Sequence, residues 1–306
     1  MTQKDKATIL LAIGIAAVST AAIFIRFAQN EAPSLVIAAY RLGLATLILA
    51  PFCLRRSIEE LQRLTTRARI SIFVAGLLLA LHFAAWISSL ELTTVASSVV
   101  LVTTTPLWVA LLSPLVLAER LRPGVWGGLG LAMGGGILVG LSQSCDFSLT
   151  GITCNGLNGF GGGEILFGNF LALSAAWASA GYMLAGRWVR PFLSLSTYIF
   201  LVYGIAALLL LTAVLISGYS LFGYSISTFS FFVLLALIPQ LLGHTAFNWA
   251  LRFVPATFVA LALLGEPIGT TLLAVIFLGE TPRLGEITGG VIILGGIYLA
   301  TKTKGD

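Results

Sequence analysis

The chain has 306 residues, of which 58% are hydrophobic and only 9% are charged, and its formal net charge is +5. Soluble domains average about 45–50% apolar and about 25% charged residues. This composition excludes a water-soluble globular protein, because too few polar residues are present to cover the apolar ones. We therefore expect a lipid bilayer around the chain and no nucleic acid partner.

Ten segments are apolar over about 20 residues, the length that spans the hydrocarbon core of a bilayer. Turn signals with proline divide most of them, as at Asn30–Pro33 and Arg122–Gly124. The first segment is longer than the apolar part of a signal peptide, about 7–15 residues, so we expect it to be retained. In chain order the segments are residues 7–28, 33–54, 68–90, 94–117, 123–142, 164–188, 194–217, 229–252, 255–278 and 283–301.

The positions of lysine and arginine predict the orientation of these helices. With the N-terminus in the cytoplasm, 14 of the 17 basic residues fall on the cytoplasmic side, and only Arg283 falls outside. Such a bias is typical of multi-pass membrane proteins. It predicts a protein of the cell (inner or plasma) membrane with both termini in the cytoplasm.

Two stretches of the chain echo one another, Val100–Glu119 and Leu261–Glu280. In both, thirteen positions separate a proline, Pro106 or Pro267, from the closing glutamate. The chain is thus predicted to be two related halves, residues 1–142 and 164–306, with an external loop at 143–163. Since five helices per half is an odd number, the halves are inverted. The predicted fold is an all-α membrane protein with ten transmembrane helices, arranged as two inverted five-helix repeats around a central cavity.

The external loop contains Cys145 and Cys154 and no lysine or arginine. An oxidising exterior allows these thiols to form a disulfide, and two free thiols are the alternative. No metal-ligand spacing such as C-x-x-C occurs, so we expect no metal site and no cofactor.

Glu266 is the first candidate for a functional residue. A carboxylate within a transmembrane helix costs about 2.5–3.5 kcal/mol on insertion scales and marks a functional site by default. Counted from Pro255, it lies about 16 Å into a core of about 30 Å. Pro267 removes a backbone donor and can open the helix there, as Pro106 can in the first half. The alternative is a structural carboxyl group that only joins helices.

Arg41 lies at a similar depth, about 12 Å below the outer end of the second segment. A buried charge needs a partner, so Arg41 is expected to pair with Glu266 or to hold an anionic group of a substrate. Arg26, near the end of the first segment, is expected to reach the membrane interface.

Two histidines, His82 and His244, occupy related positions in the two halves. Each has a side chain four residues later on the same helical face, Trp86 and Asn248 respectively. These residues either line a cavity or relay protons, or they are hydrogen-bonded groups of the core. Three further side chains are candidates for the cavity wall or for the core: Thr105, which takes the position of Glu266 in the first half, and Trp177 and Tyr182.

Glycines recur in the fifth and tenth segments and allow close approach of helices. We interpret them as contacts between repeat-equivalent helices, with a homodimer interface as the alternative.

The chain resembles the EamA-type branch of the drug/metabolite transporter superfamily over nearly its whole length. The resemblance rests on the duplicated five-helix unit and on short motifs, namely Tyr40-Arg41-Leu42, Pro106 with Glu119-Arg120-Leu121, Asn169–Ala178, and Glu266-Pro267 with Gly279-Glu280. It implies a central cavity, alternating access and export or exchange of small metabolites such as amino acids. Tyr40 is a further candidate site residue, because it belongs to the motif that contains Arg41. The Cys-containing loop departs from the family pattern.

Together these features predict a secondary transporter that exports amino acids or related small polar compounds, with a proton as the candidate coupling ion. Export of cationic drugs is an alternative. An intramembrane enzyme is not expected, because the sequence has no H-E-x-x-H or G-x-S-x-G motif and no aspartate in any predicted helix. A channel or lipid scramblase is a further alternative, which flux without saturation would favour.

Overall fold

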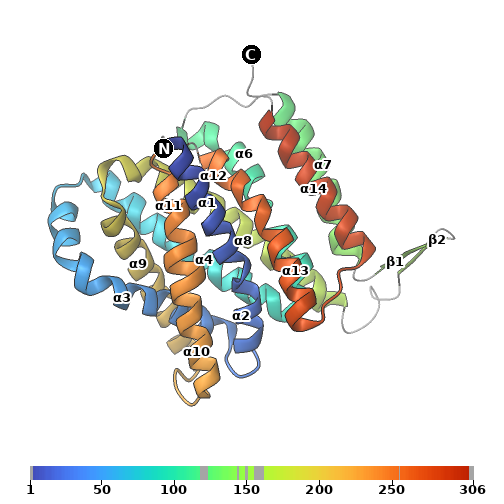
Figure 1. The fold of residues 1–306 in the computed structure, drawn as a ribbon, viewed down its shortest axis with the longest axis horizontal. Helices are drawn as coiled ribbons and strands as arrows, with labels where there is room; N and C mark the ends of the chain where they lie inside the picture. Colours follow the sequence, from blue (N-terminus) through green and yellow to red (C-terminus); the bar gives the residue numbers. More distant parts are fainter. Residues whose placement is uncertain are drawn as a thin grey trace.

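The computed structural model describes residues 3–117, 123–142, 145–148, 151–154, 162–254 and 256–302. Helices dominate it (Figure 1). In chain order the elements are α1 (Gln3–Ser19), α2 (Ala21–Ala28), α3 (Ser34–Gln62), α4 (Thr66–Leu92), α5 (Val95–Val102), α6 (Thr105–Leu117), α7 (Pro123–Ser142), β1 (Cys145–Ser148), β2 (Gly151–Cys154), α8 (Gly162–Val189), η1 (Arg190–Phe192), α9 (Leu195–Ile216), α10 (Ile226–Leu235), η2 (Ala236–His244), α11 (Thr245–Ala250), α12 (Ala256–Ala262), η3 (Leu263–Gly265), α13 (Glu266–Leu278) and α14 (Leu284–Lys302).

Within the described residues, 7 helical stretches are long and apolar enough to cross a membrane. Three shorter apolar helices, Gly130–Val139, Glu266–Leu278 and Leu284–Gly296, lie within the predicted fifth, ninth and tenth segments. A multi-pass membrane protein is therefore supported, whereas the count of ten spanning helices remains a prediction. Helix α1 begins and α14 ends at the same edge of the bundle (Figure 1).

Helices from the two halves pack against one another. The most extensive contacts join α7 to α14, α4 to α8 and α3 to α9. Figure 1 shows α7 and α14 side by side at one flank of the bundle. Glycine makes their contact close. A Cβ atom on Gly289 would lie 2.7 Å from the carbonyl oxygen of Gly135, and one on Gly135 would lie 2.6 Å from that of Gly289. These two glycines thus form a contact between repeat-equivalent helices of one chain.

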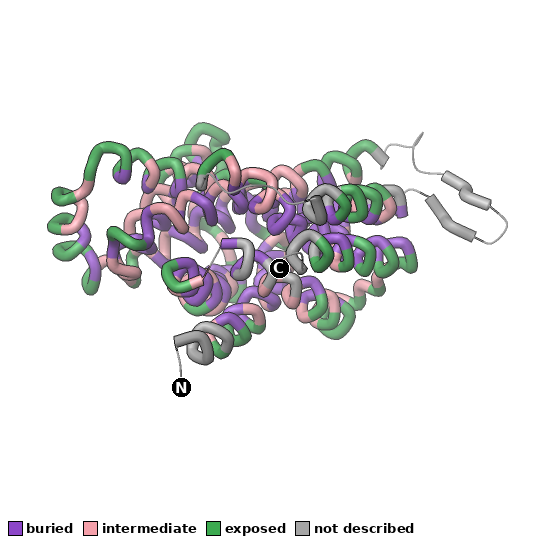
Figure 2. Tube along the Cα trace, turned by 90° about the horizontal axis from the view of Figure 1, so that it is seen from above, coloured by how far each residue is buried: buried purple, intermediate pink, exposed green. Residues whose placement is uncertain are grey.

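The outer surface of the bundle is apolar. Large hydrophobic side chains such as Phe52, Leu115 and Ile226 are more than four-fifths exposed, at 82%, 82% and 86%. In Figure 2 the exposed residues follow the outward faces of the helices and the buried ones face the interior. Apolar faces of this extent are stable in hydrocarbon and not in water.

Two glutamates near helix ends, Glu31 before α3 and Glu60 in its last turn, join helices that are distant in sequence. The carboxylate of Glu31 accepts a hydrogen bond from the backbone of Ser225 at the start of α10, at 2.8 Å. Glu60 does the same for Ser194 before α9, at 2.9 Å. Each satisfies a backbone N–H that has no partner within its own helix.

Two features differ from the sequence-based expectations. Helix α3 continues to Gln62, eight residues beyond the predicted end, because charged residues extend it past the apolar stretch with the i,i+4 pairs Arg55–Glu59 and Arg56–Glu60. The predicted loop contains an antiparallel β hairpin, so the chain is not purely helical. Its register places the backbone of Cys145 opposite that of Cys154. Their side chains, and the predicted disulfide with them, lie outside the described part of the structure, as does Glu119.

Candidate functional site

The fourth helix of the first half is interrupted near its middle. Helix α5 ends at Val102 and α6 begins at Thr105. Pro106 has no N–H to continue the helical ladder. The hydroxyls of Thr103, Thr104 and Thr105 donate to carbonyl oxygens three or four residues earlier, at 2.8–2.9 Å. These bonds satisfy carbonyls near the interruption, so this break is sealed by its own side chains.

The ninth helix is interrupted at the equivalent place. After α12, the 3₁₀ turn Leu263–Gly265 leads into α13, which begins at Glu266 with Pro267 in its first turn. Proline is well suited to this position, because the N–H that it lacks would have no helical partner. Among the described residues, Glu266 makes no hydrogen bond and no ion pair. Its half-buried carboxylate faces a cavity.

This cavity lies between the two halves and measures about 40 Å³. Its walls come from α1–α2, α3, α4, α5–α6, α8, η2 and η3–α13. It is large enough for water molecules, and much smaller than typical ligand pockets of about 300–1,000 Å³. Six of the predicted site residues line it: Arg41, His82, Trp86, Thr105, His244 and Glu266.

Arg41 is the most deeply buried charged group, with no exposed surface. Its Nε donates to Oε1 of Gln240 at 2.8 Å, and its guanidinium lies 4.1 Å from the centre of the Phe83 ring. Its two terminal nitrogens have no hydrogen-bond partner within the described part of the chain. The expected pair with Glu266 is not formed within 4.0 Å, although both residues line the cavity. Unsatisfied donors on a buried cation are costly, so they favour an acceptor that this conformation does not supply.

The two histidines meet across the cavity from opposite halves. Their ring centroids are 6.5 Å apart. Nδ1 of His82 is 2.9 Å from the carbonyl oxygen of Ala175, and a carbonyl can only accept, so this nitrogen carries a proton. His82 also stacks on Trp86 at 6.1 Å. His244 ends η2, a π-helix with Pro239 in its interior. Such segments occur often at functional sites.

Other predicted site residues lie elsewhere. Tyr182 donates to Oδ1 of Asn248 at 2.7 Å, and Nδ2 of Asn248 donates to the hydroxyl of Tyr203 at 3.2 Å. This buried network does not line the cavity. Trp177 is 53% exposed on the outer surface of α8, where lipid is expected. The hydroxyl of Tyr40 donates to the carbonyl of Leu221 at 2.6 Å, and Tyr40 does not line the central cavity.

Sequence reasoning missed Gln240, Phe83 and Ser179. Gln240 is fully buried, and its amide nitrogen has no partner in the described structure. A polar side chain within an apolar segment was a readable signal. Phe83 and Ser179 carried no such signal, since phenylalanine and serine are common throughout transmembrane helices.

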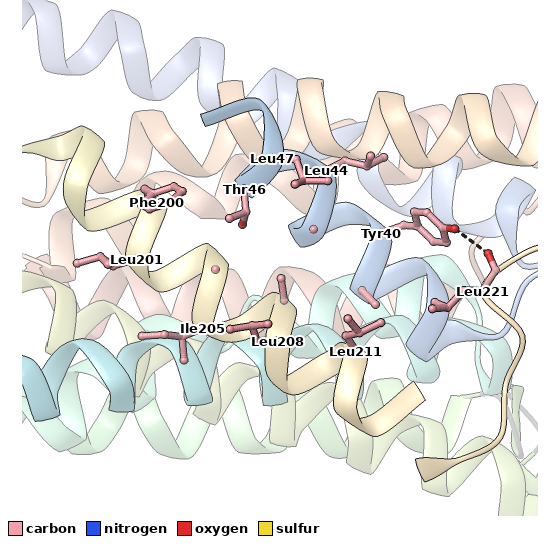
Figure 3. Close-up of a pocket in the computed structure, with 14 residues that line it drawn as sticks. Tyr40, Leu44, Thr46, Leu47, Phe200, Leu201, Ile205, Leu208, Leu211 and Leu221 are labelled. Atoms are coloured by element: carbon pink, nitrogen blue, oxygen red, sulfur yellow. Dashed lines mark hydrogen bonds between the residues drawn. The ribbon is translucent and has the colours of Figure 1, made fainter. Parts of the chain in front are cut away.

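A separate, larger groove of about 570 Å³ lies between α3 and α9 (Figure 3). Its walls are almost wholly apolar. The two polar side chains in it, Tyr40 and Thr46, both donate to backbone carbonyls, of Leu221 and Leu42. No charged group reaches it. The groove therefore offers nothing to orient a polar substrate, whereas the smaller central cavity does.

Known proteins resemble this chain in fold and in sequence. A solved structure described as "Crystal structure of protein" shares the fold, with a TM-score of 0.66 and 20% identity over 98% of this chain and 97% of that one. The "Uncharacterized transporter YdfC" of Bacillus subtilis (strain 168) is 25% identical over 200 residues, which are 64% of this chain. The match spans only 59% of that relative.

The two halves also match a family model separately. Residues 6–141 and residues 166–302 each match the EamA-like transporter family. The two matches cover most of the chain and confirm the resemblance read from its motifs. The chain belongs to the EamA-like transporter family.

Proposed function

We propose that this protein is a secondary transporter that exports zwitterionic amino acids or closely related small polar metabolites. One observation carries the proposal: a guanidinium and a carboxylate line the same cavity, and neither the two terminal nitrogens of the first nor the oxygens of the second have a partner among the described residues. A zwitterion presents one group complementary to each. Its carboxylate would accept from Arg41, and its ammonium would donate to Glu266.

The transport cycle follows from the small volume of the cavity. At about 40 Å³ it is too small for an amino acid, so the halves must separate to admit a substrate. We propose that the inverted halves rock against each other and expose the cavity alternately to the two sides. When substrate leaves, Glu266 takes up a proton, which couples transport to the proton gradient.

The proposed orientation follows from the basic residues. The positive-inside rule puts both termini in the cytoplasm of a cell whose inner or plasma membrane holds the protein. The position of α1 and α14 at one edge of the bundle is consistent with this.

The experiment is counterflow in proteoliposomes against a panel of amino acids, nucleosides and organic cations. We expect saturable exchange of amino acids in the wild type, and at least a tenfold loss in Glu266→Gln and in Arg41→Gln. Glu59→Gln is the matched control, because that carboxylate is exposed and pairs only with Arg55. It should exchange at the wild-type rate. Equal exchange in all four proteins would reduce both charges to structural groups.

One observation favours a second candidate, an exporter of organic cations. Among the described residues, Glu266 has no cationic partner within 4.0 Å, so its carboxylate is available to the ammonium of an organic cation. Saturable exchange of cations alone would select this candidate. Flux without saturation would indicate a channel or scramblase, and chemical conversion of a panel compound would indicate an enzyme.

A further inference from the structure

Four helices that line the cavity are tied together at one end by a single ion pair. Arg26, in the last turn of α2, contacts Oε1 of Glu280 at 2.6 Å. Its other terminal nitrogen donates to the carbonyl of Leu90 in α4 at 2.6 Å. Oε2 of Glu280 accepts from the backbone N–H of Val95, the first residue of α5, at 2.9 Å. Glu280 itself follows α13.

The backbone holds Glu280 in place. Gly279 adopts the left-handed conformation, with φ of +67°, and the N–H of Glu280 donates to the carbonyl of Ala274 at 3.3 Å. Glycine is favoured in this left-handed conformation at a helix end because it has no Cβ. The carboxylate is therefore fixed at the end of α13, about 20 Å along the helix axis from Glu266.

The contact between Arg26 and the carbonyl of Leu90 has a counterpart in the second half. Arg187 donates to the carbonyl of Leu251 at 2.8 Å, and 64 residues separate the two, the same interval that separates Arg26 from Leu90. Arg187 also donates to the carbonyl of Arg252. In the described structure, however, no carboxylate lies within 4.0 Å of Arg187. Among the described residues, the contact is thus completed by an ion pair at the end where α2 and α13 meet, whereas Glu119, which matches Glu280 in the repeat, lies outside them.

We propose that Arg26 and Glu280 form a latch that closes the central cavity at the α2 end and must break for the cavity to open there. The latch crosses between the halves, from α2, α4 and α5 to α13, which rocking would move apart. Both side chains are partly buried, at 29% and 24% exposure, so the pair is less screened by water than a surface pair. This inference rests on the rocking motion in the proposed function.

Accessibility of a cavity residue tests the latch without any substrate. Ser179 lines the cavity, so Ser179→Cys serves as reporter in a parent with Cys53, Cys145 and Cys154 replaced by serine. A small charged thiol reagent that cannot cross the membrane is added to whole cells and to inverted vesicles. We expect Arg26→Gln and Glu280→Gln each to raise the labelling rate about three- to tenfold from the side where α2 ends.

Two controls separate the latch from general damage. Arg187→Gln removes the equivalent arginine and should not raise labelling from the α2 side. The exchange R26E/E280R restores opposite charges and should return labelling toward the parent rate, which a misfolded protein would not do. Parent-like labelling in both single variants, or an equal rise in Arg187→Gln, would overturn the latch.

Counterflow measured beside the labelling distinguishes the two proposals. Saturable exchange with no labelling change would remove the latch and keep the transporter. A labelling response with no exchange of any panel compound would keep the latch and remove the proposed function.

Discussion

The two halves interrupt the same helix at matched places and fill the interruption differently. In the first half, three consecutive threonines donate back to carbonyls of the preceding turn. In the second half, the matched position holds Glu266, whose carboxylate has no hydrogen-bond partner among the described residues. Broken helices are typical of transporter sites. The comparison teaches that the repeat supplies the geometry of both breaks, while only the break in the second half carries a carboxylate among the described residues.

The largest expected effect separates the two breaks directly. Glu266→Gln should reduce counterflow at least tenfold, because among the described residues Glu266 has the only carboxylate that lines the cavity. Thr105→Val, at the matched position, should reduce it less than about threefold, because its hydroxyl bonds to Val102 and Ala176 carbonyls. Initial rates at saturating substrate provide the measurement. Equal losses in the two variants would mean that the breaks act alike.

A second test concerns α7 and α14, where both halves use glycine to bring the helices close together. Gly289→Ala should destabilise the protein by about 1–3 kcal/mol, because the new methyl group would meet Val139 and the carbonyl of Gly135 at 2.6 and 2.7 Å. Gly295→Ala in the same helix is the control, since nothing lies within 4 Å of its Cβ position. Thermal unfolding in detergent measures both. A control variant as unstable as Gly289→Ala would refute close contact as the cause.

A smaller effect is expected from the threonine-sealed break. Thr104→Val removes the hydroxyl that donates to Leu101 at 2.8 Å and accepts from Nε1 of Trp108 at 3.3 Å. We expect a loss of about 0.5–1.5 kcal/mol in thermal unfolding, with exchange largely retained. Loss of exchange without loss of stability would instead give this break a direct part in transport.

The smallest effect is expected outside the membrane, at Glu31. The pKa of this carboxyl lies below its ordinary value because it accepts hydrogen bonds from the Ser225 backbone and the Thr228 hydroxyl. A lowered pKa in the folded state means that the stabilisation is complete above the unfolded value of about 4.3 and is lost as pH falls through the folded value. The melting temperature of Glu31→Gln should therefore lie below wild type at pH 7 and approach it in acid. A gap that does not change with pH would contradict this.

Much of the architecture could be predicted from the sequence, because composition and spacing report on it directly. The matched Pro106 and Pro267 indicated two related halves, and the depths of Arg41 and Glu266 indicated one cavity. Which other side chains point toward lipid and which toward the core could not be predicted, since helices that are apolar all round show no periodicity. Trp177 and Tyr182, on one helix, thus face lipid and core respectively. The bond of Arg41 to Gln240 joins residues 199 positions apart, which no local pattern reveals.

The π-helix explains how matched residues can survive unequal spacing. Seventeen residues separate the N-cap Thr65 from His82, whereas nineteen separate the N-cap Ser225 from His244. In an α-helix, two additional residues would rotate a side chain by about 200° around the helix axis. The wider π turns of η2 offset most of that rotation, so His244 still faces His82. Duplicated halves can therefore gain residues inside a membrane helix during evolution and keep a shared site, and an alignment gap in such a helix does not signify a lost role.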